Sequence, residues 1–240
     1  MVRHHVTATD QHSLRHAVHH LRALAWLIVV WILVGLASIT IALLGGCMLA
    51  SPAWAQSASP AAARPYQVSL LRAAHGQWGL EAPVAALAAQ VHQESAWNPQ
   101  AVSRVGARGL AQFMPETARW WCELNGLSPL DCQPTNPTWA LRALAGYDKY
   151  LFDRTPARYA AYDRMWVALR GYNGGLGHWQ AEARLASGDS RAAVDAACGR
   201  ARRHPSHCPE NLAYPARILD RLQPLYAGWG PLLQQPRGAA

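Results

Sequence analysis

The sequence predicts a mostly α-helical protein, made of one helical domain behind an N-terminal hydrophobic segment. Three observations lead to this fold class. Apolar residues after residue 65 recur at helical spacing, and no strand-like alternation extends beyond a few residues. Proline and glycine divide these stretches at short intervals. Residues 23–44 are uncharged and almost wholly apolar. We therefore expect one domain over 66–230, large enough to bury a core, and a tail over 231–240.

The N-terminal segment has the length and the flanks of a membrane-targeting sequence. Residues 23–44 are long enough to span a bilayer as a helix. Residues 1–22 carry arginines against a single acid, so this end should stay cytoplasmic. Three interpretations remain: a signal peptide over 23–55 cleaved after Ala55, an uncleaved anchor in the inner membrane, or lipidation of Cys47 in a Leu-Gly-Gly-Cys sequence. Each places the rest of the chain in the periplasm, behind a linker over 56–65.

Four further cysteines support export. They form two pairs ten residues apart: Cys122 with Cys132, and Cys198 with Cys208. In an oxidising compartment such pairs predict two local disulfides. A zinc site is the alternative, but the close cysteine spacing typical of such sites is missing, so we expect no metal.

The charge balance favours an acidic partner. The formal net charge is +8 at pH 7, which in an exported protein suits an anionic polymer such as peptidoglycan. Arg200, Arg202 and Arg203 cluster without any nucleic-acid-binding motif or row of aromatics, so we expect a solvated patch and no nucleic acid. No glycine-rich phosphate loop is present, and we expect no cofactor.

The helices are predicted in order from their apolar spacing and their breakers. A short first helix covers 66–75. Pro83 suits the first turn of the second, which has an apolar stripe from Val84 and ends before Asn98-Pro99. A glycine-containing loop covers 98–114. Five more helices and their limits follow: 115–124 ending at Asn125-Gly126, 137–152 capped by Asn136, 163–170, 179–186 and 191–200. The last helix covers 211–222, with a kink expected at Pro215.

Glu94 is the candidate catalytic residue. It lies on the last turn of the second helix, at the edge of the apolar stripe. Partial burial and the negative end of the helix dipole both disfavour its charged form, so its pKa should rise. A raised pKa is what a general acid needs near neutral pH.

The residues after Glu94 resemble a known family. The string ESAWNPQAVSRVGARGLAQFMPETA (94–118) resembles the signature of the soluble lytic transglycosylases, relatives of goose-type lysozyme in the lysozyme-like superfamily. Two further blocks, ALRGYNGG (168–175) and ENLAYPARIL (210–219), are similar to later segments of that family. The resemblance spans most of 83–220 and implies a lysozyme-like helical domain. The stretch 178–208 is longer than the common family spacing.

The resemblance also implies roles for individual residues in binding peptidoglycan glycan strands. Ser103 and Gln112 would hydrogen-bond the sugar at the cleavage point. Met114 would pack against the glycan, although a core position is as good an interpretation. The remaining residues are Tyr172 and Asn173 in the same groove, Tyr214 orienting Glu94, and Trp97 as a stacking face or a buried anchor.

The acidic residues bear on the chemistry. No Asp or Glu lies between Glu94 and Glu116, whereas ordinary glycosidases use two carboxylates. The resemblance implies that Glu94 acts alone as acid and base and forms a 1,6-anhydro sugar. Asp148, Asp163 or Glu210 could still fold in from elsewhere. The alternatives are a muramidase that hydrolyses the same bond, and a non-catalytic scaffold of a trans-envelope secretion or conjugation apparatus.

Overall fold

The computed structural model describes residues 59–236. The hydrophobic segment over 23–55, Cys47, and the first three residues of the predicted linker lie outside the described residues. Most of the remaining linker belongs to the 3-10 helix η1 (Ala61–Tyr66), in which Ala63 is buried. Within the described part, no helix has the length and hydrophobicity needed to cross a membrane.

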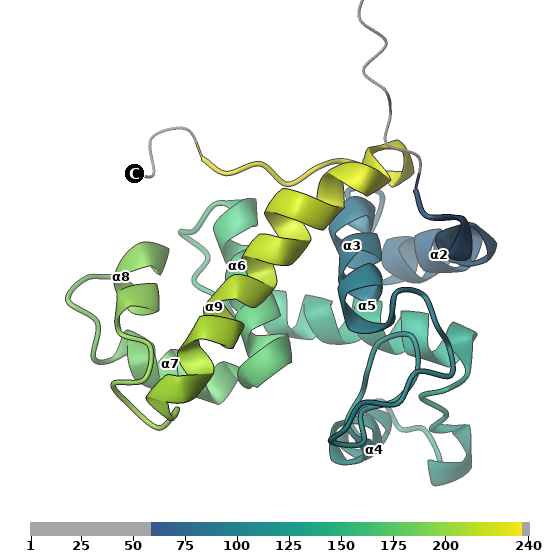
Figure 1. The fold of residues 1–240 in the computed structure, drawn as a ribbon, viewed down its shortest axis with the longest axis horizontal. Coiled ribbons are helices and arrows are strands. Elements are labelled where there is room, and N and C mark those ends of the chain that lie inside the picture. The colour runs from purple at the N-terminus through teal and green to yellow at the C-terminus, as the bar shows by residue number, and fades with distance from the viewer. Residues whose placement is uncertain (1–58, 237–240) are drawn as a thin grey trace, which may run out of the picture. The chain divides into compact units, whose positions relative to one another are not determined.

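Helix α3 (Val84–Ser95) is the centre of the domain, and every residue from Val84 to Val91 is buried. Helix α2 (Gln67–Trp78) packs beside it and against α5 (Pro137–Asp153), which continues the core into α6 (Ala161–Gly174) (Figure 1). Small alanines on α3 allow its neighbours to approach closely, so the helix that carries Glu94 is enclosed along most of its length.

The segment between α3 and α5 forms a separate layer of the domain (Figure 1). Its loop over 98–114 contains isolated bridges from Arg108 to Val102 and Phe113 but no extended strand. Helix α4 (Pro115–Leu124) follows, and a short 3-10 turn, η2 (Pro129–Asp131), leads back to α5. The Cys122–Cys132 disulfide closes this return, in agreement with the pairing predicted from the spacing.

Short helices follow α6 and fill the region over 176–207. They are α7 (Leu176–Ala183), α8 (Arg191–Ala196) and the 3-10 turn η3 (Pro205–His207). The second predicted pair, Cys198 and Cys208, is also joined, so the disulfide ties the end of this region to the start of the next helix.

The chain then crosses the domain in one long helical stretch (Figure 1). It consists of α9 (Cys208–Ala216), the π-helical η4 (Arg217–Leu222) and the 3-10 segment η5 (Gln223–Trp229). The backbone at Ala216 and Arg217 stays in the right-handed helical region. Pro215 therefore does not end the helix; the hydrogen bonding changes from α to π at Arg217.

Several predicted helix limits were wrong by up to a turn or two. The predicted helix over 179–186 is α7, which begins at Leu176 because Gly175, at φ 83°, ends α6 immediately before it. The helix predicted over 191–200 stops at Ala196, before Gly199 at φ 76°. Pro83 precedes the first turn of α3 instead of joining it, since its ψ of 57° is not helical.

Candidate active site

Glu94 lies on the last turn of α3, where the chain reverses sharply. Ala96 and Trp97 both have left-handed backbone, with φ of 49° and 68°. The indole of Trp97 is buried, and its Nε1 donates to the hydroxyl of Tyr226 over 2.6 Å. The structure therefore makes Trp97 a buried anchor and not a sugar-stacking face, and the anchor fixes the end of the helix that presents Glu94.

The carboxyl of Glu94 is half-buried and hydrogen-bonded. The hydroxyl of Tyr214, on α9, donates to its Oε1. Burial raises the pKa of Glu94 to about 7; the bond from Tyr214 opposes this rise. Burial is thus the main cause of the raised pKa that the sequence predicted. Tyr214 is itself buried, and burial and the nearby Glu94 charge raise the pKa of its hydroxyl.

Two charged residues on the same stretch as Tyr214 also act on Glu94. Glu210 raises its pKa further and Arg217 lowers it. Arg217 forms an ion pair with Glu210, and its Nε donates to the Oε1 of Gln93 on α3 over 3.3 Å. The two opposite charges therefore partly cancel at Glu94, and they hold the end of α3 against α9.

A second carboxyl lies behind the site. Asp148, on α5, is fully buried and accepts from Nε2 of Gln90 over 3.4 Å. Burial first, and then the nearby charge of Glu94, raise the pKa of Asp148 well above its ordinary value. A fully buried carboxyl has no access to substrate. Of the three acids that the sequence left open, Asp148 and Glu210 lie near Glu94, whereas Asp163 pairs with Arg191 on α8.

The loop over 98–114 carries two of the predicted binding residues. The Oγ of Ser103 accepts from the backbone of Ala107 over 2.9 Å. The Nε2 of Gln112 donates to the carbonyls of Ala101 and Gly109 over 3.1 and 3.0 Å. Both side chains brace their own loop, so Gln112 has only its Oε1 available for a sugar.

The other predicted groove residues come from two helices. Met114 is half-buried and directly precedes α4. On α6, the hydroxyl of Tyr172 donates to the carbonyl of Ala111 over 2.6 Å, which ties this helix to the loop. Burial first, and then the charge of Glu94, raise the pKa of the Tyr172 hydroxyl. Asn173 is exposed and accepts from Nδ2 of Asn211 over 3.1 Å.

The structure thus joins Tyr214 to Glu94, and Tyr172 to the loop that follows Glu94. Ser103, Met114 and Asn173 have no contact with Glu94 among the hydrogen bonds of the described residues.

This arrangement corresponds to a known family of domains. A family model described as "Transglycosylase SLT domain" matches residues 70–193. The chain belongs to this family. The match contains Glu94, the loop and α6, but it ends before α9, so Tyr214 and its neighbours lie beyond the matched part of the SLT domain.

Similar proteins extend the comparison. "Membrane-bound lytic murein transglycosylase F" of Alcanivorax borkumensis is 41% identical over 92 residues, which is 38% of this chain and 18% of the relative. The protein of the same name from Maricaulis maris is 40% identical over 100 residues, 42% of this chain and 20% of the relative. The matched SLT region thus spans about a fifth of these relatives' length.

Solved structures show the same fold. The 70 kDa soluble lytic transglycosylase of Escherichia coli has a TM-score of 0.53 and 23% identity, covering 69% of this chain and 24% of that chain. An inactive mutant of the lytic transglycosylase Slt of Pseudomonas aeruginosa has a TM-score of 0.50 and 21% identity, covering 68% and 23%. These likenesses confirm the lysozyme-like helical fold that the sequence predicted.

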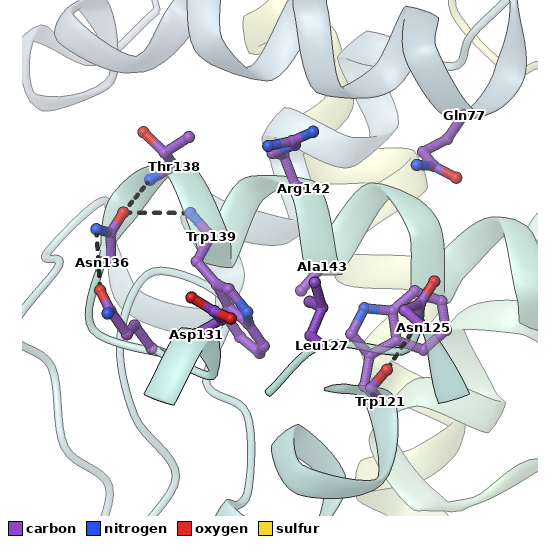
Figure 2. A pocket seen from close by; sticks show the side chains of 11 residues that line it. Gln77, Trp121, Asn125, Leu127, Asp131, Asn136, Thr138, Trp139, Arg142 and Ala143 are labelled. Carbon is purple, nitrogen blue, oxygen red and sulfur yellow. Dashed lines mark hydrogen bonds between the residues drawn. The ribbon is translucent and has the colours of Figure 1, made fainter. Parts of the chain in front are cut away.

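The SLT domain also has a cavity away from Glu94. It has a volume of about 550 Å³ and lies between α2, α4 and α5 (Figure 2). None of the predicted site residues lines it; its lining includes Gln77, Trp121, Asn125, Trp139 and Arg142. The acid and its partners are therefore a separate site.

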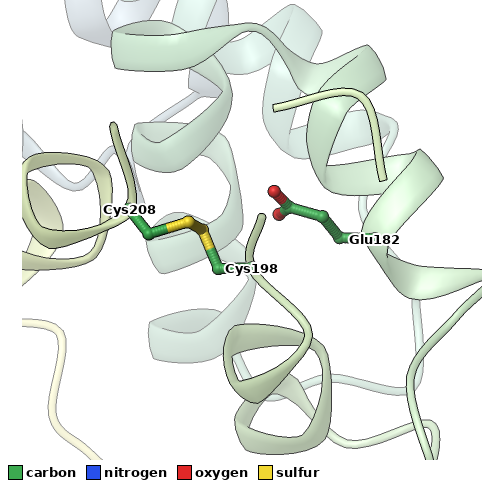
Figure 3. Close-up of side chains that lie close together, drawn as sticks. All are labelled: Glu182, Cys198 and Cys208. Carbon is green, nitrogen blue, oxygen red and sulfur yellow. A yellow bond between two sulfur atoms is a disulfide. The ribbon is translucent and has the colours of Figure 1, made fainter. Parts of the chain in front are cut away.

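One cluster in the described part resembles a metal site in composition. Glu182 of α7 lies near the sulfur atoms of Cys198 and Cys208 (Figure 3). The two sulfurs are bonded to each other, and Glu182 already binds Arg170 and Arg203 over 2.7 and 2.9 Å. These groups fit a structural clamp and not a metal centre.

Sequence reasoning did not assign roles to Arg217 and Asn211. A signal existed, because Glu210, Tyr214 and Arg217 follow the i, i+4, i+7 spacing of one helix face. Pro215 obscured it, since a predicted kink leaves the direction of later side chains undefined.

Proposed function

We propose that this SLT domain is a peptidoglycan lytic transglycosylase. It cleaves the β-1,4 bond between N-acetylmuramic acid and N-acetylglucosamine and forms a 1,6-anhydro-muramyl end, with Glu94 as the sole acid and base. The observation that carries the proposal is the half-buried Glu94 with its pKa of about 7, held by Tyr214.

The raised pKa suits both halves of the reaction. In the first, protonated Glu94 gives its proton to the glycosidic oxygen as the bond from that oxygen to C1 breaks. In the second, the Glu94 carboxylate removes the proton from the C6 hydroxyl, whose oxygen bonds to C1. The acid returns to its protonated form and no water is consumed. A group with a pKa near the working pH passes between both forms readily.

The surrounding acids support a single-carboxylate route. Asp148 is fully buried, so it contacts neither water nor sugar. Glu210 is exposed and is held in an ion pair with Arg217. A hydrolysing enzyme needs a second group that orients water, and Glu210 is the residue whose position fits that alternative.

The proposal includes binding and location. Ser103, Met114 and the Oε1 of Gln112 border the sugar at the cleavage point, and Tyr172 and Asn173 line the same groove. The domain acts in the periplasm, and residues 23–55 are a cleaved signal peptide, an uncleaved membrane anchor, or a segment that is lipidated at Cys47.

The test is mass spectrometry of the fragments that the full chain releases from purified sacculi. Wild type is compared with Glu94→Gln, and with Glu123→Gln as a matched control because Glu123 is an exposed glutamate on α4. We expect anhydro-muropeptides from wild type and the control but not from Glu94→Gln.

The other outcomes separate the alternatives. Fragments with reducing ends mean a muramidase, and Glu210→Gln should then abolish release. No release from a folded wild type means a scaffold, for which the recruiting secretion or conjugation apparatus becomes the partner to find.

A further inference from the structure

A chain of buried hydrogen bonds begins at Arg170 on α6. Its side chain is fully buried, and it forms ion pairs with Glu182 and Asp195, both over 2.7 Å. Its Nε donates to the Oδ1 of Asn211 over 2.8 Å. A guanidinium has donors and no acceptor, so Asn211 must turn its oxygen, and not its nitrogen, toward Arg170.

The orientation of Asn211 fixes the next member of the chain. Asn211 is 2% exposed. With its oxygen on the Arg170 side chain, its Nδ2 donates to the backbone carbonyl of Arg170 over 3.0 Å and to the Oδ1 of Asn173 over 3.1 Å. Rotating either amide would set oxygen against oxygen or nitrogen against nitrogen. Asn173 therefore points its oxygen inward and its NH2 group outward.

The outward NH2 group is available to a ligand. Asn173 is exposed, and no residue in the described part of the chain accepts a hydrogen bond from its Nδ2. It follows Tyr172, whose hydroxyl donates to the carbonyl of Ala111 in the loop after Glu94 over 2.6 Å. Asn211 stands three residues before Tyr214, so the bridge joins the two helices that build the candidate site.

The packing around Gly174 keeps Asn211 in place. A Cβ at Gly174 would lie 2.6 Å from Nδ2 of Asn211 and 2.3 Å from Nη1 of Arg203. Any larger residue would force the ends of these two side chains to shift. Gly174 is therefore needed because Asn211 and Arg203 approach its backbone closely, and its role does not depend on an unusual backbone angle.

We propose that Asn211, held by Arg170, is a positioning residue that presents the Asn173 NH2 group as a donor to a carbonyl oxygen of the bound glycan. This inference rests on the proposed function, because the glycan is the ligand. Two groups offer such an oxygen: the N-acetyl group of either sugar, and the lactyl-peptide part of the muramyl residue.

The test measures binding in the full chain carrying Glu94→Gln, so that bound ligand is not cut. Two probes are used, an N-acetylglucosamine oligomer and a muramyl-peptide fragment. Asn173→Asp keeps the inward acceptor for Asn211 but replaces the outward donor with an acceptor. We expect its Kd to rise about tenfold, as for a lost hydrogen bond to a ligand. Asn125→Asp, an exposed amide beside the separate cavity, is the matched control and should bind normally.

Asn211→Asp tests the positioning itself. An aspartate has no donor, so the Asn173 amide should rotate and give its NH2 to residue 211, leaving an oxygen outward. We expect a similar rise in Kd although residue 211 is buried. In 15N spectra of the parent, the Asn173 side-chain NH2 signals should shift on ligand addition, and in Asn211→Asp they should not. A general loss of structure would disturb signals throughout the domain.

Each result bears on the proposal. If Asn173→Asp weakens the binding of both probes, the acceptor is the N-acetyl carbonyl. If it weakens the binding of the muramyl-peptide alone, the acceptor is the lactyl-peptide carbonyl. Unchanged Kd in Asn173→Asp, Asn173 NH2 signals that do not respond to saturating ligand, or a parent that binds neither probe overturns the proposal. Should Asn211→Asp not fold, the Asn173→Asp Kd and the parent spectra still decide. If the Kd values change as expected but wild type releases no anhydro-muropeptides, the proposed reaction is rejected and the positioning role of Asn211 stands.

Discussion

The hydroxyl of Tyr214 donates a hydrogen bond to Oε1 of Glu94 although 120 positions separate the two residues in the chain. Glu94 lies on the last turn of α3, the most buried helix of the domain. Tyr214 reaches it from α9, in the helical stretch near the C-terminus. The bond opposes the effect of burial on Glu94, so the pKa of the acid is a balance between two distant segments.

Replacing Tyr214 with phenylalanine should raise the pKa of Glu94 above about 7, because the bond that stabilises its carboxylate is lost. Loss of protonated Glu94 would then set in at higher pH. We expect the alkaline limb of the pH profile of kcat/KM to move upward, with a roughly tenfold lower maximum from the lost orientation. Tyr66→Phe is the control. If the alkaline limb of Tyr214→Phe does not shift, the hydrogen bond from Tyr214 does not set the pKa of Glu94.

Glu94→Gln should change how stability depends on pH. The folded pKa of about 7 lies above the ordinary value of 4.5, so wild type loses stability as pH rises from about 4.5 to 7 and Glu94 ionises. The glutamine has no such loss. In thermal unfolding, the advantage of the variant should grow over this window to about 3 kcal/mol and then level off. The stability of Glu123→Gln should follow the same pH dependence as that of wild type. A stability difference between Glu94→Gln and wild type that stays constant with pH would refute the burial effect.

Glu182→Ala should destabilise the domain strongly. Glu182 is fully buried between Arg170 and Arg203. Removing it leaves the buried guanidinium of Arg203 without an ion-pair partner and that of Arg170 with Asp195 alone. We expect a loss of about 3–5 kcal/mol in urea unfolding. Glu116→Ala removes a comparable pair at an exposed site with Arg119 and should cost less than about 1 kcal/mol. Similar losses in both would mean that the buried cluster adds nothing beyond a surface pair.

Two loop glycines allow a matched test of close packing. Gly106 and Gly109 have φ of 89° and 77°, so alanine is strained at both, by roughly 1–2 kcal/mol. At Gly109, a Cβ would also lie 1.9 Å from the carbonyl oxygen of Pro134, whereas nothing lies within 4 Å at Gly106. Gly109→Ala should therefore be clearly the less stable variant in urea unfolding. Equal losses would show that the loop moves away from Pro134 freely.

The sequence alone predicted the helices best where breakers define them. Pro115 and Asn125 bound α4, and the predicted limits were those of the structure. The limits failed between 175 and 200, where Gly175 ends α6 and α8 stops before Gly199; both glycines have a positive φ. Spacing along the chain carries no information on which glycines take that conformation, because packing decides it.

For the site, the sequence could place Glu94 and predict the direction of its pKa. It could not decide which of Asp148, Asp163 and Glu210 lies near Glu94, or whether Trp97 is buried, since both depend on contacts between helices distant in sequence. The roles of Asn211 and Arg217 were missed for the same reason: each acts through a partner on another helix.

The order in which the site is completed follows from the place of α9 in the chain. Synthesis proceeds from the N-terminus, so Glu94 and its loop emerge before Tyr214, Arg217 and Tyr226. A partly synthesised chain has the acid without the hydroxyl that binds it and without the anchor of Trp97. The candidate site is therefore assembled last, and a chain that lacks its C-terminal helical stretch contains the acid but not the contacts that set its pKa and hold its helix end.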